Sequence, residues 1–263
     1  MLTVLQTALE VGLIYGLVAL ALFISFSILN IADLSTDGCF TLGCAVGAML
    51  TIAGHPILAL FAAMAAGMLS GYVTAFLQTR LGVESILAGI ISNTGLYTIN
   101  LAVMGFSSNV SITGVDTVFS LFKGLVGGQW SRLILLALIA AVIVIVLIRF
   151  FGTSLGLSIR ATGDSLDMVS ASSINPKATI TIGLCLANAL TALSGCLIGE
   201  YNKFCDINLG TGMVTIALAS LIIGEVFAGH RGGVGKRIVC VVLGSIVYRF
   251  IIALALRLNI SAE

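Results

Sequence analysis

Long apolar runs separated by short polar breaks occupy most of this 263-residue chain. A membrane-spanning helix needs about 20 predominantly apolar residues, and eight runs come near that length. The pattern therefore predicts an all-α polytopic membrane protein of about eight transmembrane helices, folded as one domain over residues 1–263. The predicted spans are roughly Leu5–Leu29, Gly38–Ile52, Pro56–Thr79, Val83–Met104, Arg132–Phe150, Ala178–Gly199, Gly212–Phe227 and Ile238–Leu256.

Two of these spans, Gly38–Ile52 and Gly212–Phe227, are short for a full crossing, and each follows a polar break that contains glycine. The breaks hold polar residues in similar places: Asn30, Asp33 and Asp37 in the first, Asn202, Asp206 and Asn208 in the second. The two units begin five spans apart, an odd number, so one is upside down relative to the other. Inverted repeats with broken helices are a recurring plan of transporters. The alternative is that any two helix–loop–helix stretches look alike.

Composition excludes a soluble protein. Only 9% of the residues are charged and 59% are hydrophobic, with a mean hydropathy of +1.18, whereas soluble domains carry roughly 25% charged residues. The alternating ten-residue segments of a membrane β-barrel are absent from the sequence. A net charge of +1 and the lack of a basic stretch give no sign of nucleic-acid binding. Because the amino terminus lacks a basic n-region, we expect the first apolar run to be retained as a span.

Lysine and arginine positions indicate the orientation, since cytoplasmic loops carry an excess of both. With the amino terminus outside, seven basic residues fall on the cytoplasmic side and four on the exterior side. The cytoplasmic set is Arg80, Arg149, Arg160, Lys177, Arg231, Lys236 and Arg237, and the exterior set is Lys123, Arg132, Lys203 and Arg257. The sequence therefore predicts an exterior amino terminus.

The loop over residues 152–177, between the fifth and sixth spans, is rich in turn and capping residues. We expect Asp164 to cap a short helix from Ser165 through Ser173, with Asp167 in its first turn. Asn175 and Pro176 then stop that helix and start the next. Such a helix would lie across the cytoplasmic face and expose Met168 and Ile174 to a soluble partner. The alternative is an ordinary solvated loop.

The same loop resembles a known family, the ABC permeases of the branched-chain amino acid and ribose importer type. The resemblance covers nearly the whole chain, and its most specific part is the Arg-Ala-x-Gly-Asp motif. It rests on Thr153–Asp164, Ile174-Asn175, Ala192–Gly195, Ile222–Glu225 and Tyr248-Arg249. Within that family the chain looks most similar to a poorly characterised branch, some members of which are linked with tryptophan or tyrosine uptake.

The resemblance implies a function and partners. The loop would carry the coupling helix, which sits in a groove of a cytoplasmic ATPase subunit. The residues that match the family's motif are Arg160, Ala161, Gly163, Asp164, Asp167 and Asn175. The chain would work as a homodimer in the bacterial cytoplasmic (inner) membrane, with an extracytoplasmic solute-binding protein. It would bind no cofactor itself, because ATP-Mg would bind to the partner ATPase.

Two features depart from the family pattern. Ser173 stands where the family often has glycine before the Ile-Asn pair, so the turn there could be tighter or shifted. Family members also usually continue with one more apolar span, whereas this chain ends at Glu263. We therefore expect that a carboxy-terminal helix is missing from it.

Polar residues inside the predicted spans are the candidates for a path or gate, because charged groups in hydrocarbon usually face a bundle interior or a watery path. Glu225 and Arg249 either pair with each other or line the path. Asn93 and Asn188 either hydrogen-bond across helices or contact the solute. The preferred gate residues are Asp33, Asp37 and Asp206, in the breaks that also hold Asn30 and Asn202.

Other motifs carry no chemistry. Four GxxxG pairs predict close helix packing: Gly12/Gly16, Gly43/Gly47, Gly67/Gly71 and Gly195/Gly199. The stretch Gly229–Arg237 fails the P-loop pattern, because Lys236 is followed by arginine and not by serine or threonine. Six cysteines without a CxxC pair read as small buried hydrophobes, and we find no catalytic arrangement. The hypotheses are thus an ABC importer permease, a stand-alone ion-coupled carrier, or a channel; only the first needs the capped cytoplasmic loop.

Overall fold

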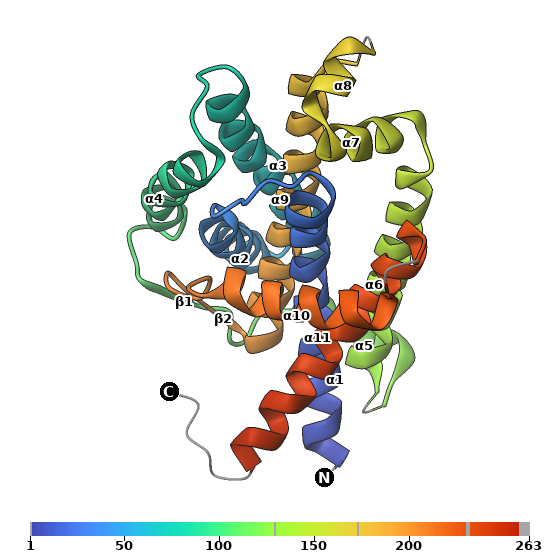
Figure 1. The fold of residues 1–263 in the computed structure, drawn as a ribbon. Helices are drawn as coiled ribbons and strands as arrows, with labels where there is room; N and C mark the ends of the chain where they lie inside the picture. The colour runs from blue at the N-terminus through green and yellow to red at the C-terminus, as the bar shows by residue number, and fades with distance from the viewer. Residues whose placement is uncertain (1, 129, 173, 230–231, 258–263) are drawn as a thin grey trace.

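The computed structural model describes residues 2–128, 130–172, 174–229 and 232–257, and helices dominate this part of the chain (Figure 1). The elements in chain order are α1 (Leu2–Leu22), the π-helical segment η1 (Phe23–Ile28), α2 (Thr36–Ile52), α3 (Pro56–Thr79), α4 (Ser85–Val103), β1 (Asn109–Ser111), α5 (Val118–Val126), α6 (Ser131–Phe151), α7 (Ser154–Asp164), α8 (Leu166–Ala171), α9 (Pro176–Asn202), β2 (Phe204–Asp206), α10 (Met213–Ala228) and α11 (Val234–Arg257).

The predicted spans are confirmed as helices. Within the described residues, six helical segments are long and apolar enough to cross a membrane: α1 with η1, α3, α4, α6, α9 and α11. The two spans predicted to be short are the shorter apolar helices α2 and α10. Each of them starts directly after a polar break. The break takes the place of the extra helical turns that a full-length crossing would need. The fold is therefore all-α and polytopic.

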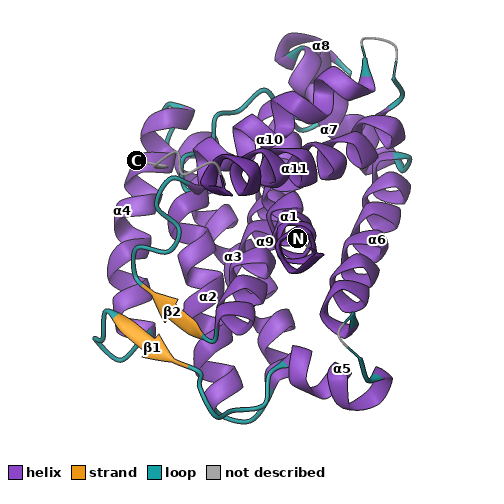
Figure 2. Cartoon of the chain, turned by 90° about the horizontal axis from the view of Figure 1, so that it is seen from below, coloured by secondary structure: helices purple, strands orange, loops and turns teal. Residues whose placement is uncertain are grey.

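Helices α1 and α9 form the centre of the bundle. In their most apolar windows, 72% and 83% of the residues are buried, against 22–33% in the other four candidate spans. Figure 2 shows α4 and α6 on opposite flanks, with α1 and α9 between them. The flanking helices expose large apolar side chains such as Ile90 on α4 and Ile145 on α6, as a surface that faces lipid does.

Small residues allow the central helices to approach closely, as the GxxxG pairs predicted. A Cβ atom at Gly43 of α2 would overlap the Ala192 carbonyl of α9, and one at Gly195 of α9 would overlap the Phe40 carbonyl of α2. Gly71 of α3 likewise lies against the α9 backbone at Leu184. Without a hydrophobic driving force in lipid, such close packing is what holds membrane helices together.

The packing of the two repeat units is reciprocal. Helix α1 packs against α11, the third helix of the second unit, and α9 packs against α3, the third helix of the first. Likewise α2 packs against α9 and α10 against α1. Figure 1 shows α1 rising from the amino terminus while α9 descends from α8. This is the contact pattern that two inverted units would make around a common axis.

Besides α8, which matches the predicted short helix, two helices and one pair of strands lie outside the predicted spans in the described part of the chain. The helices are α5 and α7, and the strands are β1 and β2, which pair antiparallel through Val110 opposite Cys205. In Figure 1 the start of α1 and α5 lie at one end of the bundle, and α7 and α8 at the other. The Lys123 and Arg160 loops are therefore on opposite faces, as the charge pattern predicted; Arg231 lies outside the described residues.

Candidate functional site

The loop with the Arg-Ala-x-Gly-Asp motif folds into two helices, α7 and α8, which we call the docking segment (Ser154–Ala171). The expectation that Asp164 caps the short helix is wrong. Asp164 ends α7 in helical conformation, whereas Ser165 is extended and its side chain accepts a hydrogen bond from Met168 N at 3.3 Å. An N-cap requires that extended backbone. The predicted last residue, Ser173, lies outside the described residues, and α8 ends at Ala171.

The docking segment exposes both large apolar and charged side chains. Met168 is 70% exposed and Leu157 is 52% exposed. The side chains of Arg160, Asp164 and Asp167 are exposed as well. An exposed apolar patch bordered by charge is the usual character of a protein-binding surface. As expected, Met168 is solvent-exposed, while Ile174 is half-buried.

The inward face of α7 is tightly joined to the bundle. Ile159 is fully buried, and the hydroxyls of Thr162 and Thr179 lie 2.8 Å apart in a hydrogen bond to α9. Gly163 lies against the end of η1, where a Cβ atom would overlap the Ile28 carbonyl. The motif therefore needs glycine there because the backbones of α7 and η1 are in contact. Ala161, beside it, is half-buried.

Asn175 and Pro176 start α9 as predicted. The Asn175 side chain accepts a hydrogen bond from Lys177 N at 3.0 Å, and Pro176 is the first residue of the helix. The missing N–H of proline costs nothing in that position. The docking segment is thus followed directly by one of the two central helices.

The first polar break is anchored to α9. Asn188 Nδ2 donates to Asp33 Oδ2 at 2.9 Å, and Ser35 donates to Asp33 Oδ1 through both its backbone N and its hydroxyl. Asp33 and Asn188 are both buried. Asn188 therefore makes the hydrogen bond across elements that was one of its two predicted roles. Asn30, exposed, adopts a left-handed conformation with φ of 57° where η1 gives way to the break.

The two breaks meet at Asp37. Its carboxylate accepts hydrogen bonds from Gly212 N at 3.0 Å and Val214 N at 2.9 Å, at the start of α10. A carboxylate there stabilises the N-terminal end of the helix dipole. Asp37 also lines a polar pocket together with Asn93 of α4. In the sequence Asp37 lies in the first break and Asn93 in the fourth predicted span, and the fold brings both to one pocket.

The second break is joined to α2 through its backbone, since Gly210 N donates to Thr41 Oγ1 at 3.1 Å. Asn202 ends α9 and is exposed. Asp206, in β2, accepts a hydrogen bond from Asn208 N at 2.8 Å, which closes a local turn. In the structure Asp206 therefore shapes the turn that leads into α10.

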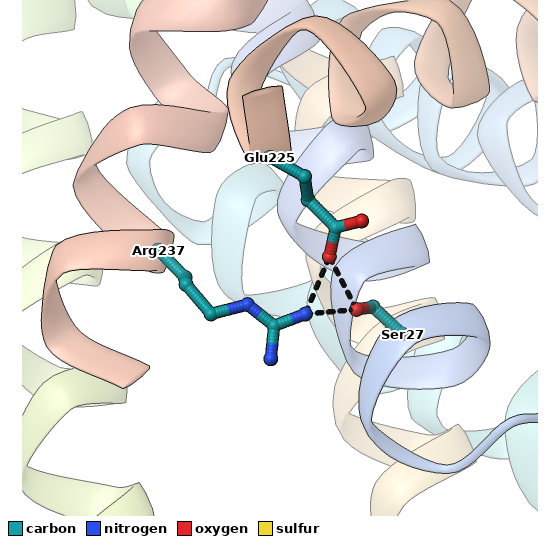
Figure 3. Close-up of polar contacts among 3 residues, drawn as sticks. All are labelled: Ser27, Glu225 and Arg237. Atoms are coloured by element: carbon teal, nitrogen blue, oxygen red, sulfur yellow. Dashed lines mark hydrogen bonds and ion pairs between the residues drawn. The ribbon is translucent and has the colours of Figure 1, made fainter. Parts of the chain in front are cut away.

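The suggested pair of Glu225 with Arg249 is wrong. Glu225 pairs instead with Arg237, with Oε1 and Nη2 2.5 Å apart, and Ser27 of η1 bonds to both side chains (Figure 3). Arg249 lies twelve residues further along α11, about 18 Å at 1.5 Å per residue. Its guanidinium carbon lies 3.9 Å from the centroid of the Tyr15 ring, the geometry of a cation–π contact.

Sequence analysis missed several buried polar groups. Glu200, at the end of α9, accepts hydrogen bonds from Thr51 Oγ1 at 3.0 Å and from Val118 N at 2.9 Å. Glu10 of α1 accepts one from the Tyr201 hydroxyl at 2.9 Å. The signal in the sequence is a charged residue within or beside an apolar run, as both Glu10 and Glu200 are.

The family model for the permease component of the branched-chain amino acid transport system matches residues 4–261, nearly the whole chain. The chain belongs to this permease family. Membership makes it one component of a transport system, which a stand-alone carrier or channel is not. The family, the helical content and the apolar spans agree on a multi-pass membrane protein.

This permease aligns with two relatives over most of its own length and most of theirs. The tyrosine transport system permease protein of Clostridioides difficile (strain R20291) is 33% identical over 249 residues, 94% of this chain and 81% of the relative. The uncharacterized protein RP368 of Rickettsia prowazekii (strain Madrid E) is 32% identical over 260 residues, 98% and 90% of the two chains. Among solved structures, PsaBC from Streptococcus pneumoniae in complex with Fab aligns at a TM-score of 0.43 and 14% identity, over 94% of this chain and 88% of that one.

Proposed function

We propose that this permease is the membrane-spanning subunit of an ATP-driven importer for a small solute, an amino acid or a related small molecule. Two copies would surround a central path in the bacterial cytoplasmic membrane. Two cytoplasmic ATPase subunits, which bind ATP-Mg, would dock on the two docking segments. An extracytoplasmic binding protein would deliver the solute to the opposite face.

The observation that carries this proposal is the docking segment. Its outward face exposes Leu157, Met168 and Arg160, and its inward face is joined to η1 and α9. A loop that only connects two spans needs neither face. Both are needed by a segment that binds a soluble partner on one side and transmits its movement on the other.

A route for that movement runs from the docking segment through η1. Gly163 touches the Ile28 carbonyl, so a shift of α7 displaces the end of η1. Ser27, the residue before Ile28, is hydrogen-bonded to Glu225 of α10 and Arg237 of α11. Beyond Ile28 the chain continues to Asp33, which is bonded to α9. Closure of the ATPases would thereby move the middle of α9, the end of α10 and the start of α11 together.

An aromatic amino acid is the solute we propose to test first. The relative from Clostridioides difficile is named for tyrosine transport, and the sequence resembles the branch linked with aromatic amino acids. The spans of this chain carry few charges, which suits a solute that is neutral overall, as L-tyrosine is at neutral pH.

The test is uptake by vesicles that contain the permease and its ATPase, with the binding protein outside and ATP inside. We expect L-tyrosine to accumulate only when all three proteins and hydrolysable ATP are present. Uptake by the permease alone, driven by an ion gradient, would contradict the proposal and favour a stand-alone carrier. Matched vesicles with a non-hydrolysable ATP analogue provide the control.

A further inference from the structure

A polar pocket of about 400 Å³ lies between α2, α4 and the segment that precedes α10. We call it the α2–α4 pocket; the lining residues that matter for its chemistry are Asp37, Asn93, Tyr97, Thr98, Asn100 and Thr211. Its volume falls within the range of small-molecule sites, about 300–1,000 Å³. The protein lies mostly in hydrocarbon, where a polar pocket of this kind marks a solute path.

Asp37 is the charged residue of the pocket wall, and its carboxylate keeps acceptor capacity. Each oxygen receives one backbone N–H, from Gly212 to Oδ2 and from Val214 to Oδ1. A carboxylate offers about four acceptor positions, so about half of them remain for a ligand. The same two bonds fix the orientation of the carboxylate, which makes Asp37 a rigid acceptor.

Asn100 contributes a second acceptor to this wall. Its Nδ2 donates to the Gly38 carbonyl at 3.0 Å, and because a carbonyl can only accept, this bond determines which way the amide lies. Asn100 is only 1% exposed, and its Oδ1 has no hydrogen-bond partner within the described part of the chain. A buried acceptor left without a donor costs about 1–3 kcal/mol, so the site is favoured when a ligand supplies one.

We infer that the α2–α4 pocket holds the protonated amino group of the solute during transport, which rests on the proposed function. Asp37 and the Asn100 amide provide the acceptors for an ammonium group. The half-exposed ring of Tyr97 and the hydroxyls of Thr98 and Thr211 lie on the same wall and suit the rest of a zwitterionic amino acid. The permease would then contribute to solute selection beyond what the binding protein does.

Paired variants on two exposed tyrosines test this inference. Tyr97 in the pocket and Tyr72 of α3 are 51% and 53% exposed, so Tyr72→Ala is a matched control for Tyr97→Ala. The assay is the number of L-tyrosine molecules transported per ATP hydrolysed, in vesicles of phosphatidylglycerol, whose headgroup has no amine. We expect Tyr97→Ala to lower this ratio at least tenfold and Tyr72→Ala to change it less than twofold.

Substrate protection tests the amino-group chemistry directly. In a Cys185→Ala background, which removes the half-buried native thiol, Thr98→Cys should react with a water-soluble thiol reagent. We expect millimolar L-tyrosine to slow that reaction at least fivefold. The analogue without the amino group, 3-(4-hydroxyphenyl)propionate, should not slow it.

The outcomes separate the two proposals. Equal protection by both compounds, or a Tyr97→Ala variant with the wild-type transport ratio, would overturn the pocket inference while leaving the importer proposal intact. Failure of the wild-type complex to couple ATP hydrolysis to L-tyrosine uptake would contradict the proposed function, and the pocket inference with it.

Discussion

At the scale of single residues, the most informative position is Gly163, because its role depends on a contact between two backbones. The sequence marks it as part of a motif but gives no hint that the Ile28 carbonyl lies against it. The same limit explains the error over Glu225: which arginine it meets depends on where α11 begins relative to α10. Charges within apolar runs could be recognised from sequence, but their partners could not.

The first prediction concerns Gly163→Ala. The new methyl group would overlap the Ile28 carbonyl, so α7 and η1 must separate, at a cost of about 1–3 kcal/mol for an overpacked contact. We expect ATPase activity that no longer responds to the loaded binding protein, with the complex still assembled. Gly152→Ala is the control, since a Cβ there meets Arg149 O at an ordinary 3.4 Å. If the loaded binding protein still stimulates ATPase activity normally in the Gly163→Ala variant, this contact is not part of the coupling route.

The second prediction concerns the Glu225–Arg237 pair. Both side chains are about one-third exposed, so we expect a modest interaction free energy, about 0.5–1 kcal/mol. A double-mutant cycle with Glu225→Gln and Arg237→Gln, read from thermal unfolding in detergent, measures it. The corresponding cycle with Arg249→Gln should give an interaction energy near zero. A larger energy for Glu225 with Arg249 would restore the pairing suggested by the sequence.

At the scale of elements, hydrophobic periodicity predicted all eight apolar helices, including the two short ones, because span length is set by the membrane. It missed α5, α7 and the β1–β2 pair, since elements of this length depend on their neighbours. The first residue of α5, Val118, for example, donates its backbone N–H to the carboxylate of Glu200 in α9, 82 residues further along the chain. The short helix of the 152–177 loop was predicted and is present as α8, yet its cap was assigned one residue too early.

The third prediction follows from that cap. Ser165→Ala removes the hydrogen bond that begins α8 and should cost about 1 kcal/mol of local stability. Asp164→Ala leaves the cap in place and serves as the control. We expect faster amide hydrogen exchange over Leu166–Ala171 in Ser165→Ala alone. Faster exchange in the Asp164→Ala variant instead would support the cap expected from the sequence.

At the scale of the whole molecule, the positions of the docking segment and α5 give the fold two different ends. The docking segment and α5 lie at opposite ends of the bundle. If the docking segment binds a cytoplasmic ATPase, its end faces the cytoplasm and the α5 end faces the exterior. The sequence predicted this separation from the distribution of lysine and arginine, while the reciprocal packing of α1 on α11 and α3 on α9 required the three-dimensional structure.

The fourth prediction tests that polarity. In a background without the six native cysteines, Ser165→Cys should react with an impermeant thiol reagent only after the cells are opened. Lys123→Cys on α5 should react in intact cells. Labelling of Ser165→Cys from outside intact cells would reverse the topology and place the docking segment out of reach of a cytoplasmic ATPase.

The most direct test of the central claim is assembly with the ATPase. Arg160→Glu with Met168→Glu places negative charge on the exposed face of the docking segment, and Lys123→Glu with Leu121→Glu makes the matched change on α5 at the opposite end. The measurement is the amount of ATPase retained by the affinity-tagged permease after purification in detergent. We predict at least a tenfold loss for the docking-segment variant and less than twofold for the α5 variant. Equal retention by both would contradict the assignment of α7 and α8 as the ATPase-binding element.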